Sequence, residues 1–171
     1  MAPSDSRDTG PLQYDNEFWR FSLAVYGQHE VANECLQLQQ ALGIDINLLL
    51  SCAWLGARDV SLSKATIEAA SSSVAVWHEN VVRPLRGVRQ KIKLLNRNDF
   101  EGFRAKVKGM ELEAEQIEQA ILFEHSKKIQ GSRADCRDAI AQNVKNYITM
   151  KSSTARPSAP HLIDAARRLG V

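Results

Sequence analysis

The sequence predicts an all-α protein, a single-domain helical bundle of about six to eight helices around a buried central helix at residues 44–56. After the capping Asp45, this central segment is apolar on every face apart from Asn47 and Ser51. At about a dozen residues it is well short of the roughly 20 that span a bilayer. Elsewhere, apolar residues recur at steps of three and four between capping residues and glycines. No segment of useful length alternates like a strand.

Length, composition and cysteine content are those of one globular domain in a reducing compartment. A chain of 171 residues with 44% hydrophobic residues can bury one core, and its formal net charge of +2 favours neither DNA nor a membrane as partner. The three cysteines are odd in number and form no CxxC pair, so we predict a cytoplasmic protein without disulfides. We expect a disordered arm at 1–14, a helical domain at 15–151, and a linker with a short helix at 152–171.

The first three helices are bounded by capping residues. Asp15 or Asn16 can cap a helix at 17–26, and a second helix at 28–42 ends at Gly43. In the central helix, Asp45 is a good N-cap, since its carboxylate can accept from amides of the next turn. Gly56 is expected to end that helix as a left-handed residue.

A long antiparallel helical hairpin is predicted at about 76–127. Ser61 or Ser63 can cap a helix near Lys64, and an apolar seam with steps of four and three then continues to Leu95. Within this seam Pro84 predicts a kink or break, because proline inside a helix lacks a donor and clashes with the preceding turn. After a short turn, the second arm carries its own heptad-like seam: Phe100, Phe103, Val107, Met110, Ala114, Ile117 and Ile121.

Two further helices should follow the hairpin. An amphipathic helix is expected around Cys136, Ile140, Val144, Tyr147 and Ile148. A short helix at 161–169 should come after the linker.

Four stretches of the chain carry a family resemblance: FWRFSLAVY at 18–26, CLQLQ at 35–39, GIDINLLL at 43–50 and VVRPLR at 81–86. In this order they resemble a proteobacterial family of about this length that is classed as a domain of unknown function. The resemblance covers most of residues 15 to 150. It implies a bacterial cytoplasmic protein, and it brings no catalytic residue, substrate or cofactor.

The sequence lacks the common motifs for catalysis, cofactor binding and metal binding. The chain has no GxGxxG, Walker loop, HExxH or GxSxG motif, and no histidine has a Glu three residues before it, as helical di-iron sites require. His78 and Glu79 are interpreted as solvated neighbours that point about 100° apart. Cys52, amid Leu, Ala and Trp, is interpreted as a core residue. The sequence therefore predicts no catalytic residue, no cofactor and no metal ligand.

A basic stripe and a polar trio are the candidate binding features. Residues 83–97 contain six cations and no carboxylate. The stripe of candidate anion or partner ligands comprises Arg83, Arg86, Arg89, Lys93 and Arg97. The alternative is that it neutralises the acidic second arm of the hairpin, and we expect such pairing at the Pro84 end with the Arg97 end left open. Asn47, Ser51 and Trp77 are the candidate pocket residues.

The sequence thus favours a helical interaction or regulatory module whose partner is a protein. Two alternatives stay open: a nucleic-acid or anion binder that uses the stripe at 83–97, and a small enzyme or ligand-binding protein with a pocket near Asn47, Ser51 and Trp77. No membrane partner is expected. The oligomeric state is not specified by the sequence.

Overall fold

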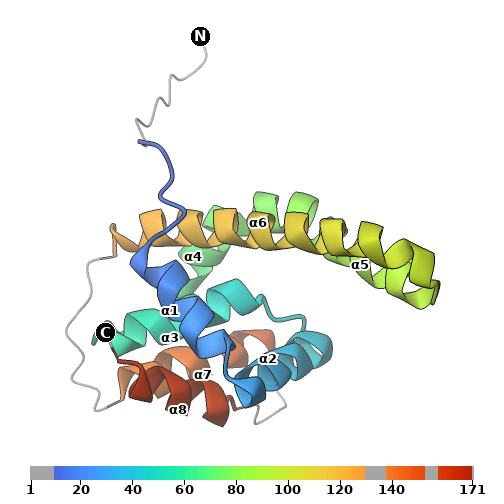
Figure 1. The fold of residues 1–171 in the computed structure, drawn as a ribbon. Coiled ribbons are helices and arrows are strands. Elements are labelled where there is room, and N and C mark those ends of the chain that lie inside the picture. The colour runs from blue at the N-terminus through green and yellow to red at the C-terminus, as the bar shows by residue number, and fades with distance from the viewer. Residues whose placement is uncertain (1–9, 130–137, 153–157, 171) are drawn as a thin grey trace.

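The computed structural model describes residues 10–129, 138–152 and 158–170. Within these ranges every regular element is helical, and no β-strand occurs, which confirms the all-α prediction (Figure 1). A π-helix (His78–Val82) and a 3-10 helix (Asn98–Phe100) accompany the α-helices. The α-helices are α1 (Glu17–Tyr26), α2 (His29–Leu42), α3 (Ile46–Ala57), α4 (Lys64–Trp77), α5 (Arg83–Leu94), α6 (Glu101–Ser126), α7 (Ala139–Lys151) and α8 (Pro160–Arg168).

Helix α3 is the centre of the bundle, as predicted. Every residue from Asn47 to Gly56 is buried. The helix packs chiefly against α7 and also contacts α1, α6 and α8 (Figure 1). Trp54 links three helices, because its ring lies 5.2 Å from that of Phe18 on α1 and 5.8 Å from that of Phe123 on α6. A helix with neighbours on all sides explains why its sequence is apolar on every face.

Several helix ends lie at the predicted capping residues. Asp45 accepts from the backbone amide of Asn47 at 2.9 Å, and Gly43 ends α2 with a φ of 64°. The prediction that Gly56 ends α3 in a left-handed conformation was wrong, because α3 continues to Ala57. The lack of a side chain at Gly56 instead allows α3 to pack closely against α7. A Cβ at this position would lie 2.5 Å from the Cα of Ile140 on α7.

Helices α4 and α5 are joined by the π-helix rather than by a break. The predicted kink or break between Asn80 and Pro84 is replaced by a change of hydrogen-bond register, in which the amide of Arg83 donates to the carbonyl of His78. The extra residue in the π turn places Pro84 in the first turn of α5. Proline is tolerated at this position, because the amides of the first helical turn have no intrahelical acceptor.

Helices α5 and α6 form the predicted antiparallel hairpin and extend beyond the rest of the bundle (Figure 1). Far from the body the hairpin has little to pack against, so its apolar seams are less buried than the heptad pattern suggests. No residue of α5 is buried. On α6, Val107 and Ala114 are buried, but Phe103 and Met110 are 62% and 55% exposed.

The C-terminal helix α8 completes the core. Its Leu162, Ala165 and Ala166 are fully buried, and the helix packs against α2 and α3. The linker predicted after Ser152 falls largely on 153–157, outside the described residues. Most of the predicted N-terminal arm, together with Cys136, also falls outside them. No described helix is both long enough and apolar enough to cross a membrane.

Candidate functional site

Three ligand-type side chains from three separate elements meet beside α3. We call Asp45, His78 and Glu118 the polar centre. The Nδ1 atom of His78 lies 2.9 Å from Oε1 of Glu118 and 3.4 Å from Oδ2 of Asp45. Asp45 is the N-cap of α3, His78 is the first residue of the π-helix, and Glu118 is on α6. The centre therefore joins the body to both arms of the hairpin.

Neighbouring groups hold both carboxylates in place. Oδ1 of Asp45 accepts from the first amides of α3. Oε2 of Glu118 accepts from the side-chain amide of Asn47 at 2.9 Å, and Asn47 in turn accepts from Gln119 at 2.8 Å. The hydroxyl of Tyr147 accepts from the backbone N–H of Asp45 at 2.9 Å. Each carboxylate thus keeps one oxygen facing His78.

Burial and charge shift the protonation of this centre. The Glu118 side chain is fully buried, and those of Asp45 and His78 are each only 14% exposed. Burial, reinforced by the charge of Glu118, raises the pKa of Asp45 to about 7. For His78, burial opposes the imidazolium, but the hydrogen bond to Glu118 and the charges of both carboxylates outweigh it and raise its pKa. Both shifts favour the protonated forms of Asp45 and His78.

The basic stripe divides into two parts with different surroundings. Near the body, Arg86 donates to Glu111 at 3.1 Å and to Glu115 at 2.7 Å across the hairpin. Arg89 also pairs with Glu111. Hydrogen bonds from both arginines lower the pKa of Glu111 against the effect of its burial. This part of the stripe is engaged in internal ion pairs.

The remaining members of the stripe are exposed. Arg83 pairs with Glu79 one turn away on its own arm, and Arg97 pairs with Asp99 at 2.6 Å. Lys93 has no ion pair within the described part of the chain. The structure therefore does not gather the five stripe residues into one free cationic surface.

The candidate pocket residues do not line one cavity. Asn47 lines a cavity of about 120 Å³ between α1, α3 and α6. Ser51 lines a separate space of about 10 Å³ in the core. The indole N–H of Trp77 donates to the carbonyl of Ala114 at 2.8 Å, which fastens α4 to α6.

The cavity at Asn47 has two polar atoms that lack partners. Its walls are mostly apolar, and they also include Ser22 and Gln119. The buried hydroxyl of Ser22 and the buried carbonyl oxygen of Gln119 have no hydrogen-bond partner among the described residues. The Ser22 hydroxyl can donate to or accept from a ligand that enters, and the Gln119 oxygen can accept from it.

The far end of the hairpin is exposed and apolar as well as basic. We call residues 88–110 the hairpin tip. Val88 and Leu95, seven residues apart on the first arm, are exposed, and so are Phe103 and Met110, seven apart on the second. Leu94 is 83% exposed. Between 90 and 108 the chain contains six cations and two carboxylates. Four of these cations, Lys91, Lys93, Lys106 and Lys108, form no ion pair with any residue that the structure describes.

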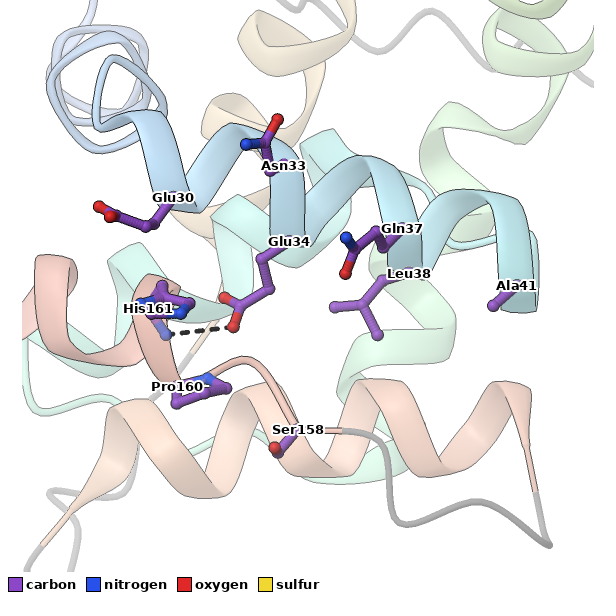
Figure 2. A pocket seen from close by; sticks show the side chains of 9 residues that line it. All are labelled: Glu30, Asn33, Glu34, Gln37, Leu38, Ala41, Ser158, Pro160 and His161. Carbon is purple, nitrogen blue, oxygen red and sulfur yellow. Dashed lines mark hydrogen bonds between the residues drawn. The ribbon is translucent and has the colours of Figure 1, made fainter.

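A larger open groove lies between α2 and α8 and measures about 410 Å³ (Figure 2). Glu34 projects into it but is already engaged, since its two oxygens accept from the backbone amides of His161 at 3.1 Å and Leu162 at 2.9 Å. The carboxylate thus caps α8 and binds it to α2. The charged side chain that projects into the groove therefore has a structural role.

The polar centre was missed by sequence reasoning. Metal-ligand motifs in a helix are recognised by spacings of three or four residues, whereas His78 and Glu118 are 40 residues apart. Asp45 was recognised only as a cap, and His78 was interpreted as solvated. That interpretation of His78 was wrong, because the ring is largely buried against Glu118. No local pattern in the sequence marks such a centre.

The fold and these sites define an all-helical protein with a buried polar centre and a projecting basic hairpin. A family model described as "Protein of unknown function (DUF2390)" matches residues 17–122. The chain therefore belongs to the DUF2390 family. The matched range contains the polar centre and all of the hairpin except the last residues of α6. A search of curated proteins and a search of solved structures each found no match.

Proposed function

We propose that the protein is a helical interaction module of the bacterial cytoplasm, which binds an acidic protein partner through its hairpin tip. One observation carries the proposal: the tip exposes apolar side chains at helical spacing beside lysines that have no ion-pair partner in the described structure. The body also exposes single apolar residues, such as Leu36, so the combination of apolar side chains with these lysines is what supports the tip as the binding surface.

The spacing of the exposed residues favours a helical partner surface. Positions seven residues apart lie on one face of a helix, and here each arm presents such a pair: Val88 with Leu95, and Phe103 with Met110. Apolar anchors at this spacing are typical of helix-to-helix recognition. Two arms with such faces can receive a partner helix.

Charge favours an acidic partner over a second copy of the chain. The excess of lysine and arginine at the tip would repel an identical tip, whereas carboxylates on a partner would pair with Lys91, Lys93, Lys106 and Lys108. Nucleic acid is less favoured than protein. Arg86 and Arg89 are already paired with glutamates, and the tip's prominent exposed side chains are apolar.

Site-specific photocrosslinking tests the proposal. A photoreactive residue at Leu94 or Phe103 should capture an acidic protein in cells, and the same probe at Leu36, an exposed apolar residue of the body, should not. Binding of the purified partner should be weakened by Leu94→Ser and by Lys93→Glu, but not by Leu36→Ser. Binding that ignores the tip substitutions would contradict the proposal. Salt-dependent binding of an oligonucleotide to the same tip would assign it to nucleic acid instead.

We keep a ligand-binding pocket as the second candidate function, because of the unpartnered hydroxyl of Ser22 and carbonyl of Gln119 at the cavity lined by Asn47. Buried polar atoms without partners are uncommon, and a ligand donor would satisfy both. A cavity of about 120 Å³ admits only a molecule of a few non-hydrogen atoms. Chemical-shift changes confined to this cavity in a screen of small amides and alcohols, abolished by Ser22→Val, would support it. A screen without such changes would exclude it.

A further inference from the structure

We propose that the polar centre of Asp45, His78 and Glu118 binds a divalent first-row metal ion such as Zn²⁺. This inference is independent of the interaction proposed for the hairpin tip. One nitrogen and two carboxylate oxygens form its donor set, and one ligand atom from each residue lies within 4.8 Å of the other two. Imidazole with carboxylates suits zinc and its first-row neighbours better than Mg²⁺ or Ca²⁺, which prefer oxygen alone.

The two distances from His78 to the carboxylates are those expected between ligands of one ion. Bonds of about 2.1 Å place two ligands of one metal about 3.0 Å apart at an octahedral edge and about 3.4 Å apart at a tetrahedral edge. Nδ1 of His78 lies 2.9 Å from the Glu118 oxygen and 3.4 Å from the Asp45 oxygen. Both separations match those of atoms that ligate one ion.

The surrounding hydrogen bonds orient the ligands as an outer coordination shell does. Oδ1 of Asp45 is occupied by backbone amides, and Oε2 of Glu118 is occupied by Asn47, so the free oxygen of each carboxylate is the one that faces Nδ1. Gln119 fixes Asn47 in turn. Such second contacts set ligand orientation and raise metal affinity.

The local charge balance calls for a cation. Glu111 and Glu115 are paired with Arg86 and Arg89 along the hairpin, which leaves His78 as the one ion-pair partner of Asp45 and Glu118 among the described residues. Two buried carboxylates and a neutral imidazole have a net charge of −2, and one divalent ion cancels it. Without an ion, protons on His78 and one carboxylate must do so. The remaining exposure of Asp45 and His78 gives the ion a path from solvent.

Coordination would have a structural consequence. Asp45 belongs to the body, His78 lies at the base of the first arm and Glu118 is on the second arm, so one ion would fasten the hairpin to the body at its root.

Titration of the metal-free full-length protein with Zn²⁺ tests the proposal. We expect one equivalent to bind, the melting temperature to rise, and the Nδ1 resonance of His78 alone to shift among the histidines in nitrogen NMR spectra. Mg²⁺ should leave all three readouts unchanged.

Matched substitutions assign the ligands. Asp45→Asn keeps a good N-cap, Glu118→Gln keeps the side-chain shape, and His78→Gln removes the ring. Each substitution should weaken Zn²⁺ binding by roughly 100-fold, because loss of a hydrogen-bond partner of a ligand alone typically weakens binding by about 10- to 100-fold. His29→Gln and Glu79→Gln alter exposed residues and should leave affinity unchanged. Absence of stoichiometric binding, or affinity that survives all three ligand substitutions, would overturn the proposal. If a variant does not fold, an unshifted His78 resonance in the Zn²⁺-treated wild type overturns it equally.

Discussion

Helices α3 and α5 have the same length, 12 residues, and opposite environments. In α3 ten residues are buried, and in α5 none. The body surrounds α3 on all sides, whereas α5 has α6 and the π-helix as its main neighbours. An apolar residue in α3 is therefore explained by folding alone, but an exposed one at the hairpin tip is not. The difference makes the tip the better place to look for a binding surface.

The largest expected contrast is between Leu49 and Leu94. Leu49 is fully buried, so Leu49→Ala should lower the free energy of unfolding by about 2–5 kcal/mol. Leu94→Ala should change it by less than about 0.5 kcal/mol, because that side chain already lies in water. Urea denaturation of both variants measures the difference. A large loss at Leu94 would indicate that another subunit covers the tip.

Two glycines test the same difference in packing between the body and the hairpin. Gly56→Ala should destabilise the protein by about 1–3 kcal/mol, because the new Cβ would meet the backbone of Ile140. Gly109→Ala on α6 should stabilise it by about 0.5–1 kcal/mol, since nothing lies within 4 Å and alanine favours the helix. Thermal unfolding reports both signs. Equal effects at the two positions would contradict the close contact between α3 and α7.

The ion pairs at the root of the hairpin should matter more than the free lysines at its tip. Arg86→Ala leaves Glu111 and Glu115 largely buried without one of their partners, so we expect a loss of about 1–3 kcal/mol. Lys91→Ala should be nearly neutral. The comparison is made by chemical denaturation at low and high salt. Neutral behaviour of both variants would mean that the stripe is not anchored internally.

The pH dependence of stability separates the polar centre from the tip. In the folded, metal-free protein the pKa of Asp45 is raised from 3.8 to about 7, so the folded state holds a proton that the unfolded chain releases. Its contribution to stability is complete below pH 3.8 and is lost as the pH rises through 7. His78, whose pKa is raised from 6.5, adds a loss of the same sign above that value.

Asp45→Asn should therefore flatten the fall in unfolding free energy between about pH 4 and 7. Tyr147, Glu118 and His78 face this group, so they must stay unchanged in the comparison. Asp99→Asn is the matched variant at the tip. There the hydrogen bond from Arg97 lowers the pKa, and any effect should be small and of opposite sign. An unaltered pH profile in Asp45→Asn would show that the aspartate is ionised in the folded state throughout this range.

The family resemblance predicted from four short stretches is confirmed by the match to residues 17–122. The family match identifies no functional residue. The candidate residues chosen from the sequence were those with conspicuous local patterns, namely a run of cations and polar residues inside an apolar helix. Local pattern does not reveal which cations find carboxylates. Arg86 and Lys93 look alike in sequence, yet one is paired across the hairpin and the other has no ion pair among the described residues.

The sequence by itself determined the α-helices, the caps that begin α1, α3 and α4, and the central position of α3. These features depend on neighbours within four residues and on apolar content. Tertiary structure alone decided three other features. It made Gly56 a contact point with α7, placed the far half of the hairpin beyond the body, and brought Asp45, His78 and Glu118 together. Each depends on how helices distant in the chain pack against one another, and the spacing of residues within one helix does not encode that packing.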